Sequence, residues 1–223
     1  MMLGKILVLE TSTESGSVAV ASDGGLIAEL SFASRNPVSG VRTEALAPAV
    51  AKCLAHASVH PRELTAVICG AGPGGFTSLR SAAALAKGLA SALQIPLYAV
   101  SSLDVLAWSA EVSDGPFVVA LPAGRNEWFF ADVRSESGRA SLVGEAGLIG
   151  NAELHARATS LHAKLIGPGL EFDTVPRASA AVRRLEEVEA DGPVAIDSWE
   201  PVYGRLAEAQ VKWEATHGRP LSL

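Results

Sequence analysis

The chain has 223 residues, of which 48% are hydrophobic and 19% charged, which is enough for one large or two small domains with real cores. Its net charge of −6 and sequence pI near 5.4 argue against a stand-alone nucleic-acid-binding protein, which usually carries a basic patch. Two isolated cysteines make no disulfide framework. The first residues do not resemble a signal peptide, and no stretch reaches the about 20 apolar residues of a membrane span. We therefore expect a cytoplasmic protein without a membrane partner.

The first half of the chain alternates apolar, strand-forming runs with polar turns and helical repeats. Three strands joined by a polar turn and a hairpin turn are expected first, over 6–9, 17–21 and 26–32. A helix, a strand and a second helix follow, over 43–57, 64–69 and 77–93. Three antiparallel strands followed by helix, strand, helix and strand form the order of an actin-like or RNase H-like half.

Four glycines, at 70, 72, 74 and 75, lie between the strand at 64–69 and the next helix. Glycine leaves the backbone amides bare, and a helix N-terminus capped by Thr77 or Ser78 favours an anion such as phosphate. A tight strand-to-helix connection explains the glycines equally well. A Walker loop does not fit, because Phe76 stands where lysine would follow the last glycine, and a dinucleotide fingerprint fits poorly. The candidate nucleotide-binding residues are Glu10, Thr11, Ser12, Gly72, Gly74 and Gly75.

The helix at 77–93 combines an apolar face, which should pack on the sheet, with a neighbouring face of very small side chains. Ala84 and Gly88 lie one turn apart on that face, framed by Arg80 and Lys87. Small side chains let a second helix approach closely. Both an interface with another subunit and ordinary packing within the chain remain open for this face.

The runs GPGGFTSLR, AKGLA and PLYAVSSLDVLA, together with the opening ILVLETSTESGSVAV, resemble the TsaB (YeaZ) family of glycoprotease-like proteins. The resemblance is strong over about residues 5–110 and weaker at 121–133 and 201–213. It implies an actin-like/RNase H-like α/β superfold with two tandem mixed-sheet domains. The first would span residues 1–110, and the second, smaller and reduced, would span 111–223 and end in a helix that packs back on the first.

The same resemblance implies a non-catalytic accessory subunit. Such a subunit would heterodimerise with a TsaD-like protein and, with a TsaE-like ATPase, support threonylcarbamoyl transfer to adenosine 37 of tRNA. The tRNA would be held mainly by the complex, and the chain alone could form a homodimer. Arg42 departs from the family pattern whereas Glu44 keeps it. The implied partner face comprises Arg42, Glu44, Leu46, Val50, Arg80, Ala84, Lys87 and Gly88.

Glu10 stands where the superfold usually has aspartate, so the charge is kept on a longer arm. It could retain a phosphate or metal role, or it could simply close the turn. Ser101 and Val105 occupy the positions where TsaD proteins carry the His-x-x-x-His metal site, and Ser101 and Ser102 would instead cap a helix running to residue 110. We therefore expect no catalytic residue, metal ligand or intrinsic cofactor, and at most ATP or ADP near the junction with the partner.

The second half repeats the mixed pattern more weakly. Strands are expected at 117–121 and 128–133, a short strand at 165–166, and helices at 152–158, 178–188 and 205–213. Two other functions remain open. One is a nucleotide-binding ATPase or kinase that uses Glu10 and the glycine turn, for which a second carboxylate is hard to find. The other is a glycoprotease-like metallopeptidase, for which no Ser/His/Asp set is legible.

Overall fold

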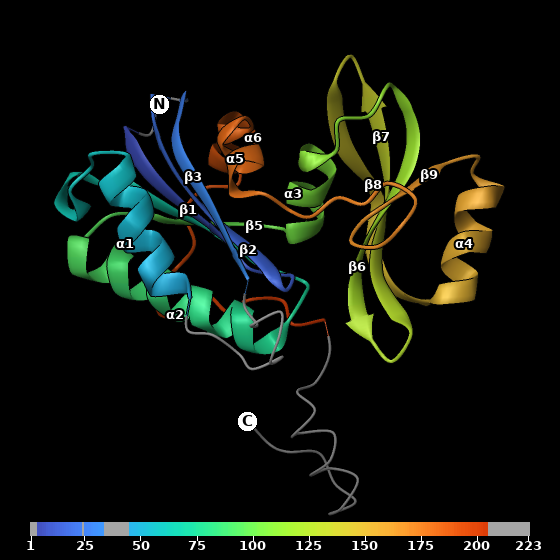
Figure 1. Cartoon of the computed structure of the whole chain (residues 1–223), viewed down its shortest axis with the longest axis horizontal. Coiled ribbons are helices and arrows are strands. Elements are labelled where there is room, and N and C mark those ends of the chain that lie inside the picture. Colours follow the sequence, from blue (N-terminus) through green and yellow to red (C-terminus); the bar gives the residue numbers. More distant parts are fainter. Residues whose placement is uncertain (1–3, 24, 34–44, 205–223) are drawn as a thin grey trace, which may run out of the picture.

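The structure, a computed structural model, describes residues 4–23, 25–33 and 45–204 (Figure 1). It contains two mixed sheets, with strand orders β3-β2-β1-β4-β5 and β8-β7-β6-β9. We call the five-stranded sheet with the helices on its two faces the first lobe, and the four-stranded sheet with α4 the second lobe. Helix α3 lies between the two sheets (Figure 1). The predicted actin-like/RNase H-like fold class is confirmed.

The elements of the first sheet follow one another along the chain in the order that the sequence predicts. Strands β1 (Lys5–Glu10), β2 (Ser15–Ser22) and β3 (Gly25–Ala33) pair antiparallel. Strands β4 (Ala66–Gly70) and β5 (Leu97–Val100) continue the sheet in parallel with β1. Helices α1 (Leu46–His56) and α2 (Phe76–Leu93) pack on one face of this sheet. Because side chains alternate along a strand, β1 sends Leu7 and Leu9 to that face and Ile6 and Val8 to the other.

Helix α3 (Ser102–Ser109) packs against both lobes. Leu103 and Leu106 join the core of the second sheet, whereas Val105 and Trp108 pack with residues of the first lobe. The second sheet and its helix comprise β6 (Gly115–Gly124), β7 (Glu127–Glu136), β8 (Arg139–Gly150), α4 (Asn151–Ser160) and β9 (Lys164–Ile166). Strands β6, β7 and β8 are antiparallel, and β9 runs parallel to β6.

After β9 the chain returns to the first lobe. Helices α5 (Ala178–Val182) and α6 (Leu185–Ala190) cover the sheet face that carries Ile6 and Val8. The single helix expected over 178–188 is therefore wrong, because the chain breaks at Arg183 and Arg184 between two short helices. The predicted boundary between domains 1–110 and 111–223 stays a prediction. Helices α5 and α6 belong to residues 111–223 but pack on the sheet formed by residues 1–110.

Other expectations at the edges of elements need correction. The strand expected from residue 64 begins at Ala66, because a 3-10 turn over Pro61–Glu63 precedes it. Strand β8 was not predicted at all. The start of the helix expected from Thr43 lies outside the described residues, and so does the whole of the helix expected over 205–213. Within the described part of the chain, no helix is long and apolar enough to span a membrane.

Candidate functional site

The two motifs that the sequence singled out meet at one edge of the first sheet. Strands β1 and β4 are parallel neighbours, with Leu9 opposite Cys69, so the turns that follow them lie side by side. The first turn carries Glu10, Thr11 and Ser12, all of them buried. The second is the glycine turn at 70–75, which leads into α2.

The carboxylate of Glu10 is bonded within the protein. Its Oε1 accepts a hydrogen bond from the Ser12 amide at 2.7 Å, and Ser102 Oγ donates to it from 3.0 Å at Oε2. Ser102 Oγ also accepts a hydrogen bond from the Gly72 amide at 3.2 Å. Burial raises the pKa of Glu10 above its ordinary value. Glu10 therefore links the polar turn, α3 and the glycine turn.

This geometry corrects the expected caps of two helices. Ser101 caps α3 by accepting from the Leu103 amide, but Ser102 bridges Glu10 and Gly72 instead. Helix α2 begins after Gly75 with no side-chain cap, so Thr77 and Ser78 lie inside the helix. Thr11 reaches across to this first turn, and its Oγ1 donates to the Ser78 carbonyl at 3.1 Å.

The glycines make room for the chain's own atoms. A Cβ at Gly70 would lie 2.2 Å from Glu10 Oε2, and one at Gly74 would lie 2.3 Å from the Ser12 carbonyl oxygen. Gly72 has a φ of +87°, and a Cβ there would lie 2.4 Å from the Val202 carbonyl oxygen. Glycine is required where the backbone adopts a positive φ or where another group approaches this closely.

Two backbone amides of the glycine turn already have acceptors inside the protein. The Gly75 amide donates to the Ser12 carbonyl at 2.8 Å, and the Ala71 amide donates to the Val100 carbonyl at 2.7 Å. Ser12 Oγ is buried without a hydrogen-bond partner. Among the described residues there is no group of three His, Cys, Asp or Glu side chains able to hold a metal ion. The arrangement fits a turn closed on itself better than an open cradle for a nucleotide.

The segment 199–203, which we call the C-terminal strap, lies over the glycine turn and along α2. The Val202 amide donates to the Ala71 carbonyl at 2.7 Å. The Tyr203 ring lies 4.6 Å from that of Phe76, and Lys87 pairs with Glu200 at 3.1 Å. Trp199 packs against the core of the first lobe. These aromatic residues thus pack within the chain.

The structure divides the residues expected at the partner face into two groups. Ala84 and Gly88 are exposed on α2, and a Cβ at Gly88 would meet nothing within 4 Å. Val50, by contrast, is only 6% exposed in the core, and Leu46 packs beside it. Arg80 is exposed near the Phe76 ring, and Lys87 is held by the strap. Arg42 and Glu44 lie outside the described residues.

Part of the outer surface of α1 and α2 consists of very small side chains, beside the exposed Pro48, Lys52 and His56 of α1 and Arg80 of α2. We call this part the small-residue face. Its exposed members are Ala47, Ala51 and Ala55 on α1 and Ser81, Ala84 and Gly88 on α2. Both helices pack on the same side of the first sheet (Figure 1), so a second protein could approach both helix backbones closely.

Sequence reasoning missed three residues of the closed turn. In the sequence, Gly70 is only one of four glycines in a turn, Ser102 is a candidate helix cap, and no pattern points to Val202. Both β1 and β4 are continuous apolar runs, which is typical of neighbouring buried strands, and this signal could have placed Gly70 and Glu10 at the same edge of the sheet without showing their contact. Val202 lies against the glycine turn because the chain returns to the first lobe after the second. No pattern in the sequence around Val202 predicts this contact.

The fold and this site define a two-lobed α/β protein of the actin-like class. Comparison with known proteins agrees. A family model described as "TsaD: tRNA N6-adenosine threonylcarbamoyltransferase" matches residues 18–162. The tRNA threonylcarbamoyladenosine biosynthesis protein TsaB of Bacillus subtilis is 28% identical over 93% of this chain and 97% of its own length. TsaB of Escherichia coli is 31% identical over 60% of this chain, which spans 57% of that protein.

Two solved structures from Pseudomonas aeruginosa have the same fold over almost their whole length. YeaZ aligns with a TM-score of 0.71 and 25% identity, covering 90% of this chain and 99% of that one. A protein described as similar to peptidase YeaZ aligns with a TM-score of 0.75 and 26% identity, covering 91% and 100%. The chain therefore belongs to the family that the TsaD model describes, where it stands with the TsaB (YeaZ) proteins, and the resemblance drawn from the sequence is confirmed.

Proposed function

We propose that the chain takes part in threonylcarbamoyladenosine biosynthesis in tRNA as a non-catalytic accessory subunit that heterodimerises with a TsaD-like protein. The observation that carries this proposal is the exposed small-residue face on α1 and α2. Open space around Gly88 and Ala84 suits a helix of a partner. The relatives named TsaB support the pathway, and one of them matches nearly the whole chain.

The closed turn supports an accessory rather than a catalytic role. Glu10 is already bonded to Ser12 and Ser102, and the Gly72 and Gly75 amides donate within the chain. A nucleotide at this turn would have to displace those bonds. ATP or ADP is therefore proposed at the junction with the partner, where a TsaE-like ATPase would act, with no cofactor bound by this chain alone.

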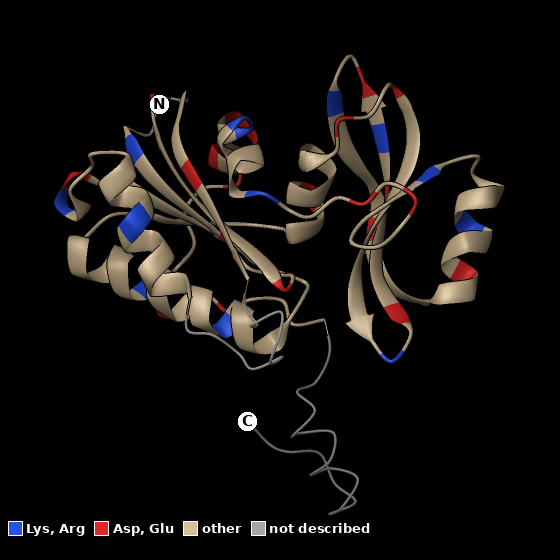
Figure 2. Cartoon of the chain, viewed as in Figure 1, with Lys and Arg blue, Asp and Glu red and all other residues tan. Residues whose placement is uncertain are grey.

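Charge supports holding tRNA mainly through the complex. The net charge is −6, and Lys and Arg residues of the described chain are scattered over both lobes rather than gathered along one element (Figure 2). Phosphate backbones are bound by clustered basic side chains. The partners would then supply most of the positive surface.

The interface is tested by co-purification with the TsaD-like protein of the same organism. Gly88→Arg and Ala84→Glu should abolish the complex, because a long or charged side chain would separate the two helix surfaces. Gly88→Ala and Ala156→Glu are the matched controls, the first small and the second an exposed alanine on α4. Both controls should bind like the wild type. Retention of the partner by Gly88→Arg would overturn the interface.

The role is tested by a tRNA threonylcarbamoylation assay with each protein alone and together, the TsaE-like ATPase being present throughout. Product should appear only when this chain and the TsaD-like protein are combined. Product from this chain without the TsaD-like protein would contradict the accessory role. Hydrolysis of ATP by the isolated chain, lost on Glu10→Gln, would favour the ATPase or kinase function instead. In the absence of its partner we expect the same face to allow homodimers, which Gly88→Arg should dissociate.

A further inference from the structure

The tip of the β7–β8 hairpin belongs to the second lobe and is held in one conformation. The Asp114 carboxylate accepts hydrogen bonds from the Ser137 amide at 2.9 Å and the Gly138 amide at 3.2 Å. Ser135 Oγ also donates to it at 3.3 Å. The hairpin therefore presents the Gly138 carbonyl and the Arg139 side chain in fixed positions.

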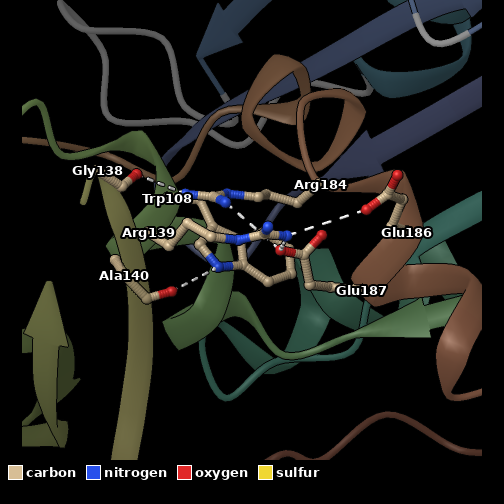
Figure 3. A network of polar contacts seen from close by, with 7 residues as sticks. All are labelled: Trp108, Gly138, Arg139, Ala140, Arg184, Glu186 and Glu187. Atoms are coloured by element: carbon tan, nitrogen blue, oxygen red, sulfur yellow. Dashed lines mark hydrogen bonds and ion pairs between the residues drawn. The ribbon is translucent and has the colours of Figure 1, made fainter. Parts of the chain in front are cut away.

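Two side chains of the first lobe bind this tip (Figure 3). Arg184 donates to the Gly138 carbonyl at 2.8 Å. Glu187, at the start of α6, accepts from Arg139 at 2.8 Å and from Arg184 at 3.4 Å. One carboxylate is thus shared between a guanidinium of each lobe. Its neighbour Glu186 is 93% exposed and lies 4.0 Å from Arg139, whereas Glu187 is 35% exposed.

Trp108 of α3 completes the junction. Its indole Nε1 donates to the Ala140 carbonyl of β8 at 3.3 Å, and its own carbonyl accepts from Arg183 at 3.2 Å. Arg183 lies between α5 and α6, which pack on the first sheet. The Trp108 indole proton consequently reports on contact between the hairpin and the first lobe (Figure 3).

We propose that Trp108, Arg139, Arg184 and Glu187 form an interlobe latch, a conformational device that fixes the angle between the two lobes and opens when the charge of Glu187 is removed or screened. The contacts that cross the junction here are polar and charge-assisted, unlike the apolar contacts between α3 and each sheet. Charge-assisted hydrogen bonds are stronger than neutral ones and weaken with salt when they are partly exposed. The latch is therefore the part of the junction that should open when the charge of Glu187 is neutralised or screened by salt.

The latch is tested by NMR of the tryptophan indole protons in the full chain, with the Trp108 signal assigned from Trp108→Phe. In Glu187→Gln, exchange of the Trp108 indole proton with solvent should be about three- to tenfold faster than in wild type. Glu186→Gln removes the same charge one residue away and should change this rate less than twofold. The Trp128 indole, which donates to Asn151 Oδ1 at 2.9 Å inside the second lobe, is the internal control.

Salt and a second variant complete the test. In about 1 M NaCl, where the screening length falls to about 3 Å, wild type should exchange Trp108 as fast as Glu187→Gln does, and the variant should change little further. Arg139→Gln should accelerate exchange in the same direction. Equal rates in Glu187→Gln and Glu186→Gln would overturn the latch, as would an equal acceleration at Trp128, which would indicate general destabilisation.

Discussion

The side chain of Glu10 occupies the volume that any side chain at position 70 would need. Gly70 and Glu10 are therefore coupled. Because residue 70 has no Cβ, there is room for the side chain of glutamate, which is longer than that of aspartate. The sequence showed both residues and the unusual choice of glutamate. It could not show that they touch, because that contact depends on the register between β1 and β4.

The Glu10–Gly70 contact predicts a non-additive pair of substitutions. Gly70→Ala should destabilise the protein by about 1–3 kcal/mol, because overpacking a buried site forces atoms apart. In a Glu10→Asp background the shorter arm retracts, so the same alanine should cost at least about 1 kcal/mol less. Chemical denaturation of the four proteins of this double-mutant cycle measures the coupling. Fully additive costs would contradict the contact.

Asp104 gives a prediction for pH. Burial raises its pKa to about 6, assisted by the charge of Asp191, whereas a hydrogen bond with Ser101 acts in the opposite direction. Between the ordinary aspartate pKa near 4 and this value, the folded state binds a proton that the unfolded state has released. The free energy of unfolding therefore falls as the pH rises through this window, by up to about 3 kcal/mol.

Asp104→Asn should remove this loss. The variant should match wild type near pH 4 and be more stable by about 1–3 kcal/mol above pH 6, as urea denaturation across this range would show. Asp114→Asn is a control of opposite sign, because hydrogen bonds from the Gly138 and Ser137 amides lower the Asp114 pKa. It should lose stability relative to wild type as the pH rises towards about 4, and this difference should stay constant at higher pH. A pH-independent effect of Asp104→Asn would contradict the assignment.

At the scale of elements, α5 depends on its surroundings for its existence. A helix of five residues is not stable alone, and its first amides bond to other elements. The Ala178 amide donates to Ser17 Oγ at 2.8 Å, and the Ser179 amide donates to Glu29 Oε1 at 3.0 Å. Glu29 also pairs with Arg177 at the surface of the sheet. Strand β2, through Ser17, and the edge strand β3, through Glu29, thus bind the start of the helix in the returning chain.

Glu29→Ala should consequently destabilise the protein by about 1–3 kcal/mol, because a buried amide and a guanidinium lose their acceptor. Hydrogen exchange of the residue 178–182 amides should accelerate more than that of α2. Glu145→Ala, at an exposed position of β8, should leave both quantities unchanged within about 0.5 kcal/mol. Uniform acceleration across both helices would indicate that Glu29 does not act through α5.

The elements that the sequence predicts well are those with strong local patterns. Strand β1 and helix α2 have regular apolar spacing and clear breakers. Strand β8 has neither, because it lies at a sheet edge and leaves Val143 and Leu148 exposed. The break between α5 and α6 coincides with a contact of Arg183 with α3 and a contact of Arg184 with the second lobe, neither of which a local sequence window contains. For the candidate site, the sequence identifies the polar turn and the glycine turn as motifs, but it does not predict that the two turns bond to each other.

At the scale of the whole molecule, α3 contributes side chains to the cores of both lobes, so we expect the two lobes to unfold as one cooperative unit. Leu106 is fully buried in the core of the second sheet, one residue from Val105 in the core of the first lobe. Leu106→Ala should lower the stability of both lobes together by about 2–5 kcal/mol. Thermal unfolding should remain a single transition, with calorimetric and van't Hoff enthalpies in agreement. Two separated transitions would show that the lobes unfold independently.

The return of the chain to its first sheet has a consequence for how the protein is synthesised. While the ribosome is producing the second lobe, the sheet face that carries Ile6, Val8 and Ile68 lacks the cover that α5 and α6 provide, because these helices are still to be made. A fragment of residues 1–110 would therefore expose apolar side chains on this sheet face, and we expect it to aggregate. A soluble first lobe is better obtained by splicing the codons for 178–190 directly behind it.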